Sequence, residues 1–341
     1  MARERGHSKA VRVLAPDWHA AEIGAPLVSI DAELRRRWGP TVLRAAGRLT
    51  PLRGLLIFIA ARNFDRVGVV LKSPGALTLT ALEALTGRPR DRLVLLTFLP
   101  REPSKRPLVN LGLKLRFQAI ERPAVRRAMR AGHVLTEAEQ HRYAERYRVP
   151  ITRFRVIPWA LASGTTSADP ASAREPRVIA SGRAFCDWET LFAAARTGDW
   201  PLTVICGARD ADRVAALNED ERAHVLVEIE NDEHDRLLAA ASVYALCLRD
   251  EGPSAGHVRL LAAVDAGLAV VASDVRGLEG YVVPGETAEL VPPRDPEALA
   301  QAIGALLSDE KRRRLLAAAA QRRARRWTYT EMWRALGELL T

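Results

Sequence analysis

The stretch that decides the fold is residues 243–272, V-Y-A-L-C-L-R-D-E-G-P-S-A-G-H-V-R-L-L-A-A-V-D-A-G-L-A-V-V-A. Its two apolar runs, Val243–Leu248 and Leu268–Ala272, have the length and composition of strands that are buried on both faces. Between them, Gly256–Ala266 has the length and spacing of a helix. A strand, a helix and a second buried strand in this order predict a unit of a parallel sheet.

The same alternation extends over the rest of the second half. The other strands predicted there are Val178–Ser181, Leu202–Cys206, Val225–Ile229 and Glu289–Val291. The other predicted helices are Trp188–Thr197, Ala211–Leu217, Asp232–Ala240 and Pro296–Leu307, followed by a strongly helical end over residues 309–341. This pattern is typical of a doubly wound parallel sheet with helices on both faces.

The first half repeats the pattern less regularly. Its predicted strands are Val11–Leu14, Val67–Leu71, Leu93–Phe98, His133–Thr136 and Arg153–Pro158. Its predicted helices are Ala20–Trp38, Leu52–Arg62, Gly75–Thr86 and Pro107–Ala131. Residues 161–176 are small, polar and proline-bearing, which is typical of a linker. The sequence therefore predicts an α/β fold of two Rossmann-like doubly wound domains that face each other across a cleft. They cover residues 1–160 and 177–322, with residues 323–341 as a terminal helix that packs back toward the first domain.

Length and composition exclude several classes of protein. The chain has 341 residues, of which 48% are hydrophobic, and this is too apolar for a disordered chain. No apolar run approaches the roughly 20 residues that cross a bilayer, and the charged N-terminus lacks the apolar stretch of a secretory signal. The cysteines Cys186, Cys206 and Cys247 have neither metal-ligand nor disulfide spacing, which favours a reduced, cytoplasmic location and predicts no metal site.

Charge is divided unevenly between the two halves. Residues 1–160 hold 30 Lys and Arg against 13 Asp and Glu, a net charge of +17. Residues 161–341 hold 21 against 28, a net charge of −7. A basic half joined to an acidic half suggests two domains with different partners. Nothing in the chain resembles a nucleic-acid recognition motif, so we expect no nucleic-acid partner.

Two segments of the second half have the form of anion-binding loops. In residues 178–183 a strand runs into Gly182, where the backbone could approach a phosphate, and Arg183, whose guanidinium could pair with it; a plain turn is the alternative. In residues 248–257 the small residues Ser254, Ala255 and Gly256 precede a helix start, where free N–H groups favour negative charge. Here the alternative is a simple N-cap. His257 fits a polar residue of the first helical turn better than a catalytic base.

These segments belong to a pattern that resembles the donor domain of retaining glycosyltransferases of family 4, fold type GT-B. The resemblance runs through S-G-R-A-F-C-D-W-E-T-L (181–191), L-L-A-A-A-S-V-Y-A-L (237–246) and residues 254–274. It is densest in R-G-L-E-G-Y-V-V-P-G-E-T-A-E-L-V-P-P-R-D-P-E-A-L-A-Q-A-I (276–303). In the first half only residues 131–159 are recognisably similar.

The resemblance implies a nucleotide-diphosphate sugar bound by the second domain, with the acceptor facing the first. Retention in such enzymes is explained by front-face attack, in which donor phosphate oxygens receive the acceptor proton. The family needs no metal or other cofactor when cationic side chains and helix N–H groups neutralise the diphosphate. Arg183 matches the family's phosphate-binding Arg and Gly182 the turn before it. Ser254, Ala255 and Gly256, with His257 next to them, match the loop over the phosphates and sugar.

The sequence also departs from the family at several anchor positions. Cys186 and Asp187 stand where the family has a second cation, and Ala262 stands where it has the Glu that binds the ribose hydroxyls. Asp265 is a candidate substitute one helical turn further on, which would displace its carboxylate by about 5 Å. The first domain has no Gly-rich loop near its start, and residues 97–101, T-F-L-P-R, replace the family's frequent His.

Three explanations of these departures stay open. The chain is an active enzyme with altered anchors, a pseudo-glycosyltransferase that activates a partner enzyme, or an enzyme for another activated substrate. A second open question concerns the basic stretch Pro103–Arg130, where Lys and Arg alternate with apolar residues. It reads either as an amphipathic helix on an anionic membrane, where this family often finds lipid-linked acceptors, or as a solvated helix with its apolar face in the core.

Overall fold

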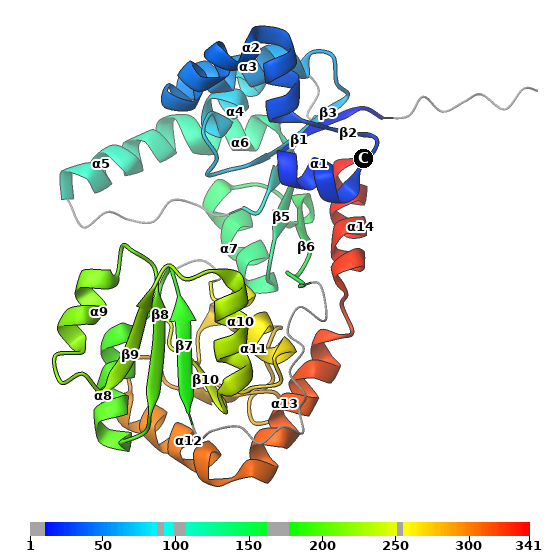
Figure 1. The fold of residues 1–341 in the computed structure, drawn as a ribbon. Helices are drawn as coiled ribbons and strands as arrows, with labels where there is room; N and C mark the ends of the chain where they lie inside the picture. The colour runs from blue at the N-terminus through cyan, green and yellow to red at the C-terminus, as the bar shows by residue number, and fades with distance from the viewer. Residues whose placement is uncertain (1–10, 87–91, 99–106, 162–176, 251–254) are drawn as a thin grey trace, which may run out of the picture. The chain divides into compact units, whose positions relative to one another are not determined.

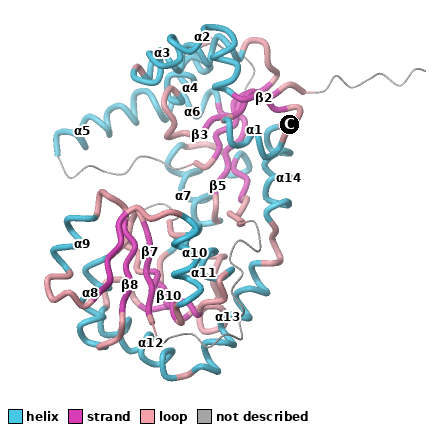
Figure 2. The backbone as a smooth tube through the Cα atoms, viewed as in Figure 1, coloured by secondary structure: helices cyan, strands magenta, loops and turns pink. Residues whose placement is uncertain are grey.

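The computed structural model of the chain describes residues 11–86, 92–98, 107–161, 177–250 and 255–341. The chain divides into two compact units. Unit 1 consists of residues 1–157 and 333–341, and unit 2 consists of residues 158–332. The predicted linker lies outside the described residues except for Leu161. In each unit, strands occupy the centre and helices surround them, as Figures 1 and 2 show.

Unit 1 is built on a parallel sheet of six strands. They are β1 Val13–Ala15, β2 Leu27–Ser29, β3 Arg66–Val70, β4 Leu93–Leu96, β5 Met129–Val134 and β6 Phe154–Val156. They lie in the order β2-β1-β3-β4-β5-β6, and every pairing between neighbours is parallel. The strand order reverses between β1 and β3, because β2 lies on one side of β1 and the later strands follow on the other side. In open α/β sheets, ligands bind beyond the carboxyl ends of the strands at such a switch point.

Eight helices of the described residues accompany this sheet. They are α1 Asp17–Ile23, α2 Ile30–Arg48, α3 Thr50–Ala61, α4 Ala76–Leu85, α5 Pro107–Arg116, α6 Arg122–Ala128, α7 Glu137–Tyr147 and the end of α14 Tyr329–Leu340. The core between them and the sheet is apolar and aromatic. β4 is buried along its whole length, and beyond it Phe98 packs edge-on against Phe154 with ring centroids 5.0 Å apart. Burial on both faces explains why β4 reads as a continuous apolar run rather than an alternating one.

Unit 1 differs from the sequence-based prediction in three places. The predicted helix Ala20–Trp38 is wrong, because α1 ends at Gly24, whose φ of +72° interrupts the helix, and β2 follows as an edge strand. The predicted helix Pro107–Ala131 is also too long, since β5 already begins at Met129. Helix α7 was not predicted: it turns only a short apolar stripe inward, and it buries Glu139, whose carboxylate accepts a hydrogen bond from the Leu135 amide at 2.9 Å.

Unit 2 is built on a second parallel sheet of six strands. They are β7 Val178–Gly182, β8 Leu202–Cys206, β9 Ala223–Val227, β10 Val243–Leu246, β11 Ala269–Ser273 and β12 Glu289–Val291. Their order is β12-β11-β10-β7-β8-β9, with all pairings parallel. The switch point therefore lies between β7 and β10, two strands whose positions the sequence predicted to within one or two residues.

Helices cover both faces of this sheet. They are α8 Trp188–Gly198, α9 Ala211–Leu217, α10 Asn231–Ala240, α11 His257–Asp265, α12 Pro296–Ser308 and α13 Glu310–Ala324. Alternate strand residues serve two separate cores, as the two-residue repeat of a strand requires. Val178 and Ala180 of β7 pack in the core with α8 and α12, whereas Ile179 packs in the core with α10, α11 and α13.

Two doubly wound parallel sheets confirm the predicted α/β fold class. The helical end predicted over residues 309–341 forms α13 and α14, with an interruption before Tyr329. Within unit 1, the end of α14 packs on β3, since a Cβ placed on Gly68 would lie 2.5 Å from the Leu340 side chain. None of the described helices combines the length and the apolar character that crossing a membrane takes.

Candidate functional site

The turn after β7 brings Gly182 and Arg183 to the carboxyl edge of the sheet in unit 2. A Cβ on Gly182 would lie only 2.3 Å from the Cys186 sulfur, so the tight turn requires glycine at this position. Beyond the turn, Cys186 pairs with Leu248 in an isolated bridge, and the Arg249 amide donates to the Phe185 carbonyl at 2.9 Å. The loop is therefore fixed on β10, and it presents Arg183 outward at the switch point.

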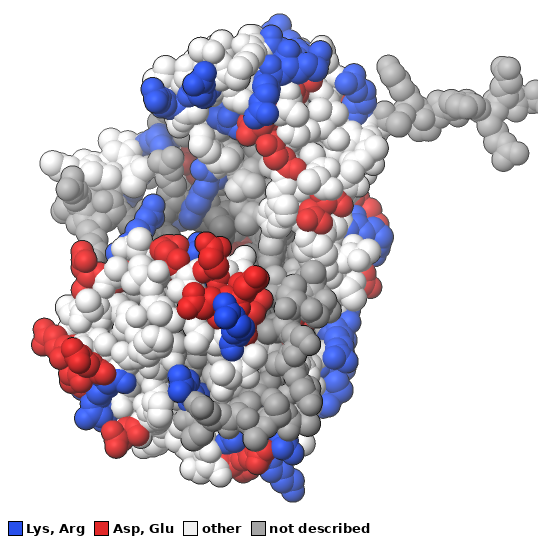
Figure 3. All heavy atoms as spheres, viewed as in Figure 1, with Lys and Arg blue, Asp and Glu red and all other residues white. Residues whose placement is uncertain are grey.

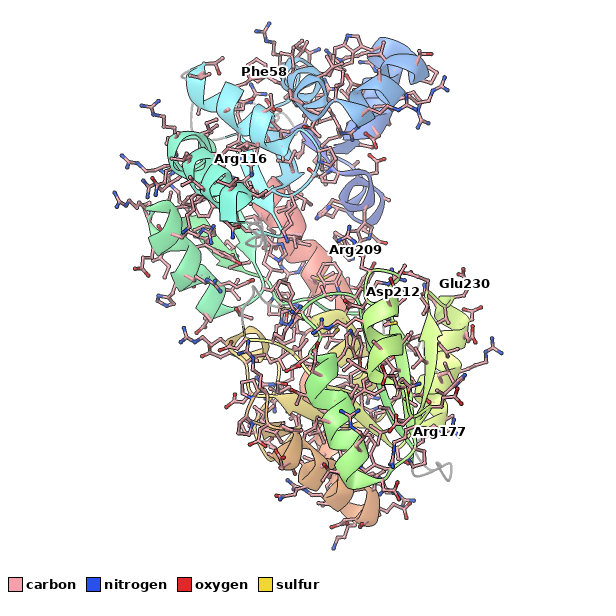
Figure 4. All side chains as sticks on the ribbon, turned by 90° about the vertical axis from the view of Figure 1, so that its left-hand side faces the viewer. Phe58, Arg116, Arg177, Arg209, Asp212 and Glu230 are labelled. Atoms are coloured by element: carbon pink, nitrogen blue, oxygen red, sulfur yellow. The ribbon has the colours of Figure 1, made fainter. Side chains whose placement is uncertain are left out.

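A narrow crevice opens at this edge, between the ends of β7 and β8 and the starts of α10 and α11. Its volume is about 10 Å³, which is room for about one water molecule. Its polar lining comes from five side chains: Arg183, Glu228, Asn231, His234 and Arg259. Figure 4 shows the same edge of unit 2 at Arg209, Asp212 and Glu230, with Arg177 at the opposite, amino edge. The crevice thus occupies the position where this class of sheet binds ligands.

Arg183 and Glu228 form an ion pair across the mouth of the crevice. Their nitrogen and oxygen lie 2.9 Å apart, and the two side chains are 61% and 45% exposed. A pair this exposed contributes at most about 1 kcal/mol to stability, so a stronger anion can displace the glutamate. Glu228 has a φ of +51° and also accepts a hydrogen bond from the Ala208 amide at 3.0 Å. A backbone held in this sparsely populated region often marks a functional position.

The inner wall of the crevice is a hydrogen-bonded chain that ends at Arg259. The Arg259 guanidinium donates to His234 Nε2 at 3.0 Å, and the Ser181 hydroxyl lies 3.0 Å from the same nitrogen. Because a guanidinium can only donate, Nε2 must be the unprotonated nitrogen. Burial and the neighbouring Arg259 charge both lower the pKa of His234, which agrees with a neutral ring. His234 is therefore an acceptor that holds Arg259 toward the crevice.

The start of α11 is arranged differently from the prediction. Gly256 is its N-cap at a φ of +82°, where a Cβ would lie 3.0 Å from Leu248, and Ala255 precedes it as a partly buried residue. His257 turns away from the crevice: its ring stacks on Tyr281 at 4.0 Å and donates from Nε2 to the Gly277 carbonyl at 2.6 Å. Burial lowers the pKa of His257 to about 4. His257 therefore holds the following loop, and the residue that reaches the crevice from α11 is Arg259.

The remaining predicted site residues have other surroundings. Asp265 lines a second cavity of unit 2, of about 750 Å³, together with Trp159 and Trp327, and does not reach the crevice. Ala262 is half-buried against the core beneath α11. Ser254 lies outside the described residues. Of the seven predicted donor-binding residues, the structure brings Gly182 and Arg183 to the crevice.

The two departures in the turn after β7 have structural roles. Cys186 is buried, and burial raises the pKa of its thiol to about 12, so it packs as a neutral side chain. Asp187 is the N-cap of α8, and its carboxylate accepts from the Thr190 amide at 3.2 Å and from the Thr190 hydroxyl at 2.8 Å. Arg259 supplies a second cation from another element of the same edge.

Sequence reasoning missed Glu228, His234 and Arg259. Glu228 directly follows the end of β9, and His234 and Arg259 lie in the first turns of the next helices, so all three occupy carboxyl-edge positions. That placement was a usable signal. What the sequence could not give is the spatial order of the strands, which brings the end of β9 and the starts of α10 and α11 to one crevice beside the end of β7. The surrounding surface is acidic, and Figure 3 shows negative side chains gathered over α10.

Unit 1 has a cavity of its own, of about 220 Å³, at the loop between β3 and α4. Lys72 and Ser73 line it from the loop, and Thr78 lines it from the first turn of α4. Arg116 reaches it from α5, with a guanidinium nitrogen 3.8 Å from the Glu121 carboxylate. The cavity follows the carboxyl end of β3, a switch-point strand, and has two cations in its wall.

Two buried histidines lie deeper in unit 1, near the position where the family often has one. His133 accepts from the Thr97 amide at Nδ1 and donates from Nε2 to the Ile157 carbonyl at 2.9 Å. His19 stands edge-on to Trp333 with ring centroids 5.4 Å apart. Burial lowers the pKa of both rings to about 4, with His133 adding to the effect on His19. Both rings are therefore neutral at neutral pH and belong to the core.

Several solved structures have a fold similar to that of this chain. Anabaena Alr3699/HepE in complex with UDP and glucose matches with a TM-score of 0.70 and 18% identity, over 97% of this chain and 99% of that one. Sucrose-phosphate synthase from Thermosynechococcus elongatus matches with 0.68 and 20%, over 87% and 78%. A glycosyltransferase from Rickettsia africae matches with 0.68 and 13%, over 98% of both chains. The fold is therefore GT-B.

The sequence match is confined to unit 2. Residues 187–309 match the family model of glycosyl transferases group 1, from the N-cap of α8 to the N-cap of α13. No curated protein sequence matches the chain. The resemblance inferred from the sequence is confirmed: the chain has the GT-B fold, and residues 187–309 of its second unit match the group 1 glycosyltransferase family.

Proposed function

We propose that the protein is a retaining glycosyltransferase. It would move a sugar from a nucleotide-diphosphate sugar bound by unit 2 to an acceptor bound by the basic unit 1. The observation that carries the proposal is the pair of arginines, Arg183 and Arg259, at one crevice on the carboxyl edge of the group 1 domain. Two guanidinium groups at a sheet switch point suit a diphosphate, whose oxygens they can bind in forked pairs.

In this proposal the donor diphosphate displaces Glu228 from Arg183. The crevice itself is too small for a phosphate group, so Arg183 has to move, and its exposed side chain is able to do so. Arg259 stays in place because His234 holds it at 3.0 Å. The free N–H groups at the start of α11 add a further donor edge. These groups neutralise the diphosphate without a metal ion, which stays a prediction of the proposal.

Glu228 is our candidate for the carboxylate that binds donor hydroxyl groups. It is the one carboxylate that lines the crevice among the described residues, and the Ala208 amide holds one of its oxygens. Once Arg183 turns to the diphosphate, the Glu228 carboxylate is available to accept hydrogen bonds from sugar or ribose hydroxyls. It would thereby replace the Glu that the family has at the position of Ala262, which binds the ribose hydroxyls. Asp265, the substitute expected from the sequence, is in the other cavity.

The transfer step follows the retaining course of the family. The bond between the anomeric carbon and the diphosphate oxygen breaks, and the acceptor oxygen bonds to the same carbon on the same face. The acceptor proton passes to the leaving diphosphate. Arg183 and Arg259 would stabilise the negative charge that grows on the leaving group, which is where preorganised cations contribute most to a rate. Determination of the anomeric configuration of the product by NMR tests retention.

The acceptor in this proposal is anionic or is carried by an anionic surface at the inner face of the cytoplasmic membrane. The support is the net charge of +17 on residues 1–160 and the cavity of unit 1, whose wall holds Lys72 and Arg116. A phosphate or carboxylate group would pair with these two cations. HepE has been crystallised in complex with UDP and with UDP-glucose, which favours uridine nucleotides as the first donors to test.

A thermal-shift series over nucleotide sugars tests the proposal. We expect one donor to raise the melting temperature of the wild-type chain and of Arg222→Ala, but not of Arg183→Ala. Arg222 is the matched control, because its guanidinium pairs with Asp199 and Asp220 on the surface of the same unit. If no donor stabilises the wild-type chain, the proposal fails. Donor binding with no transfer to any acceptor would favour the alternative, a pseudo-glycosyltransferase that assists a partner enzyme.

A further inference from the structure

Helix α5 and the turn after it expose an unusual number of aliphatic side chains. Fourteen large hydrophobic residues are exposed among the described residues, and five of them fall within residues 108–120. They are Leu108 at 84% exposure, Val109 at 44%, Leu111 at 55%, Leu115 at 59% and Ile120 at 47%. Single exposed leucines need no explanation, but a contiguous group of this kind marks a contact surface. We call these five residues the α5 apolar face.

The spacing of these residues gives α5 an apolar side that faces solvent instead of the core. Leu108, Leu111 and Leu115 are three and four residues apart, which places them on one side of α5. In a surface helix that side normally faces the core, whereas here it faces away. The chain is anchored further on, where Phe117 is half-buried against Tyr147 with ring centroids 5.2 Å apart. Figure 1 shows α5 projecting from the body of unit 1.

Positive charge surrounds the apolar face. The described residues 107–130 contain six basic residues and a single acidic one, Glu121. Glu121 is engaged inside unit 1, where its carboxylate accepts from the Tyr147 hydroxyl at 2.6 Å and faces Arg116. Lys114 lies on α5 itself, and Arg126 and Arg127 are exposed on α6. The segment therefore combines exposed aliphatic side chains with a local charge of +5.

We propose that the α5 apolar face docks unit 1 on an anionic lipid bilayer. Its leucines would enter the boundary between head groups and acyl chains, while Lys114 and the arginines of α6 meet the lipid phosphates. Both alternatives that the sequence left open hold for a part of this stretch, since over residues 107–130 the leucines of α5 are exposed, whereas Val125 and Ala128 of α6 are buried in the core. The inference does not depend on the glycosyl transfer, because it concerns a different surface and can be measured without a donor.

Two other occupants fit the surface less well. A second copy of the chain would bring two such faces together, each with a local charge of +5, and like charges oppose that contact. A protein partner usually finds tryptophan, tyrosine and arginine at the centre of a contact, whereas this face is aliphatic at its centre and basic at its flanks. An anionic bilayer is complementary to both the aliphatic centre and the positive flanks.

Co-sedimentation of the full chain with vesicles tests the inference. We expect the chain to pellet with vesicles of phosphatidylcholine and phosphatidylglycerol, but not with vesicles of phosphatidylcholine alone. The double variant Leu111→Asn/Leu115→Asn should lower the partition coefficient about tenfold or more, since it removes two side chains from the bilayer. The matched control is Leu49→Asn/Leu85→Asn, two leucines that are 58% and 76% exposed elsewhere in unit 1.

Three results would overturn the inference. One is equal recovery with neutral and anionic vesicles, and another is an equal loss of binding in the α5 variant and its control. The third is a dimer, seen by light scattering without lipid, that the α5 variant abolishes, because the face would then join two copies. A melting curve like that of the wild type shows that the α5 variant is folded, and its donor-induced thermal shift separates this result from the fate of the proposed function.

Discussion

The two units use the same architecture to present positive charge in opposite ways. Each has six parallel strands with a switch point, and each places two cations near the carboxyl edge of its sheet, Arg183 and Arg259 in unit 2 and Lys72 and Arg116 in unit 1. In unit 2 the two cations are held by partners, Arg183 by Glu228 and Arg259 by His234. In unit 1 the exposed cations Lys114 of α5 and Arg126 and Arg127 of α6 lie in a segment that also exposes leucines. Held cations suit one small ligand, whereas an exposed basic and apolar helix suits an extended surface.

The largest expected difference between the two units is the pH at which acid destabilises them. The pKa of His19 and His133 in unit 1, and of His257 in unit 2, is about 4 in the folded chain. In the unfolded chain histidine has a pKa near 6.5, so the unfolded state binds more protons between these values. Stability is therefore complete above pH 6.5 and falls as the pH drops toward 4, by about 3 kcal/mol for each such histidine.

Unit 1 holds two of these histidines. Unit 2 holds one, together with His234, whose pKa is also lowered but is partly restored by the neighbouring Asp235, so unit 1 should lose structure first. Hydrogen exchange followed by mass spectrometry at decreasing pH would show it, because amides of β4 and β5 should lose protection at a higher pH than those of β7 and β8. Simultaneous loss in both units would contradict the comparison.

The same substitution should have very different costs in α11 and α5. Leu260 of α11 is 2% exposed, and Leu260→Ala should destabilise unit 2 by about 2–5 kcal/mol, as buried leucines do. Leu111 of α5 is 55% exposed, and Leu111→Ala should change the free energy of unfolding by less than about 0.5 kcal/mol. Chemical denaturation measures both. A cost above 2 kcal/mol for Leu111→Ala would show that the α5 apolar face packs on something within the chain.

Two carboxylates distinguish the crevice from the larger cavity of unit 2. Glu228→Gln should weaken donor binding by about 1.5–3 kcal/mol, because a charge-assisted hydrogen bond to the donor is lost. Asp265→Asn should leave donor affinity unchanged, because Asp265 lines the second cavity. Fluorescence titration with the donor found in the thermal-shift series compares the two variants. The reverse order of effects would place the sugar in the second cavity.

The smallest expected difference between the units is the salt dependence of their binding to vesicles and to the donor. Added salt screens the surface charges of α5 and α6, so vesicle binding by unit 1 should fall steadily as salt rises. Donor binding should depend less on salt, since Arg259 is partly buried and is held against His234. Parallel titrations at several salt concentrations measure both quantities. An equal salt dependence would mean that the two sites do not differ in the way their cations are presented.

The sequence predicted unit 2 more accurately than unit 1, for physical reasons. In unit 2 the strands are continuous apolar runs separated by turns, and β8, β12 and α9 were located to the residue. In unit 1, β2 is a three-residue edge strand whose residues fit the apolar spacing of a helix. Strand β5 begins with Met129 and Arg130, two residues that the sequence pattern assigned to the end of a helix.

The site was predictable only where neighbours in sequence are neighbours in space. Gly182 and Arg183 follow one strand directly, so their place at the edge could be inferred from local pattern alone. Arg259 and Glu228 reach the same crevice from two other elements, and no local pattern indicates that they meet. The direction of His257 could not be foreseen either, because its partners, Gly277 and Tyr281, lie twenty or more residues further on.

Calorimetric titration of the donor into wild type, Arg259→Ala and Arg222→Ala tests the central claim, that the crevice of unit 2 is the donor site. The account predicts that Arg259→Ala weakens binding by about 1.5–3 kcal/mol, roughly ten- to a hundredfold, while Arg222→Ala binds like the wild type. Wild-type affinity in a folded Arg259→Ala chain would contradict it.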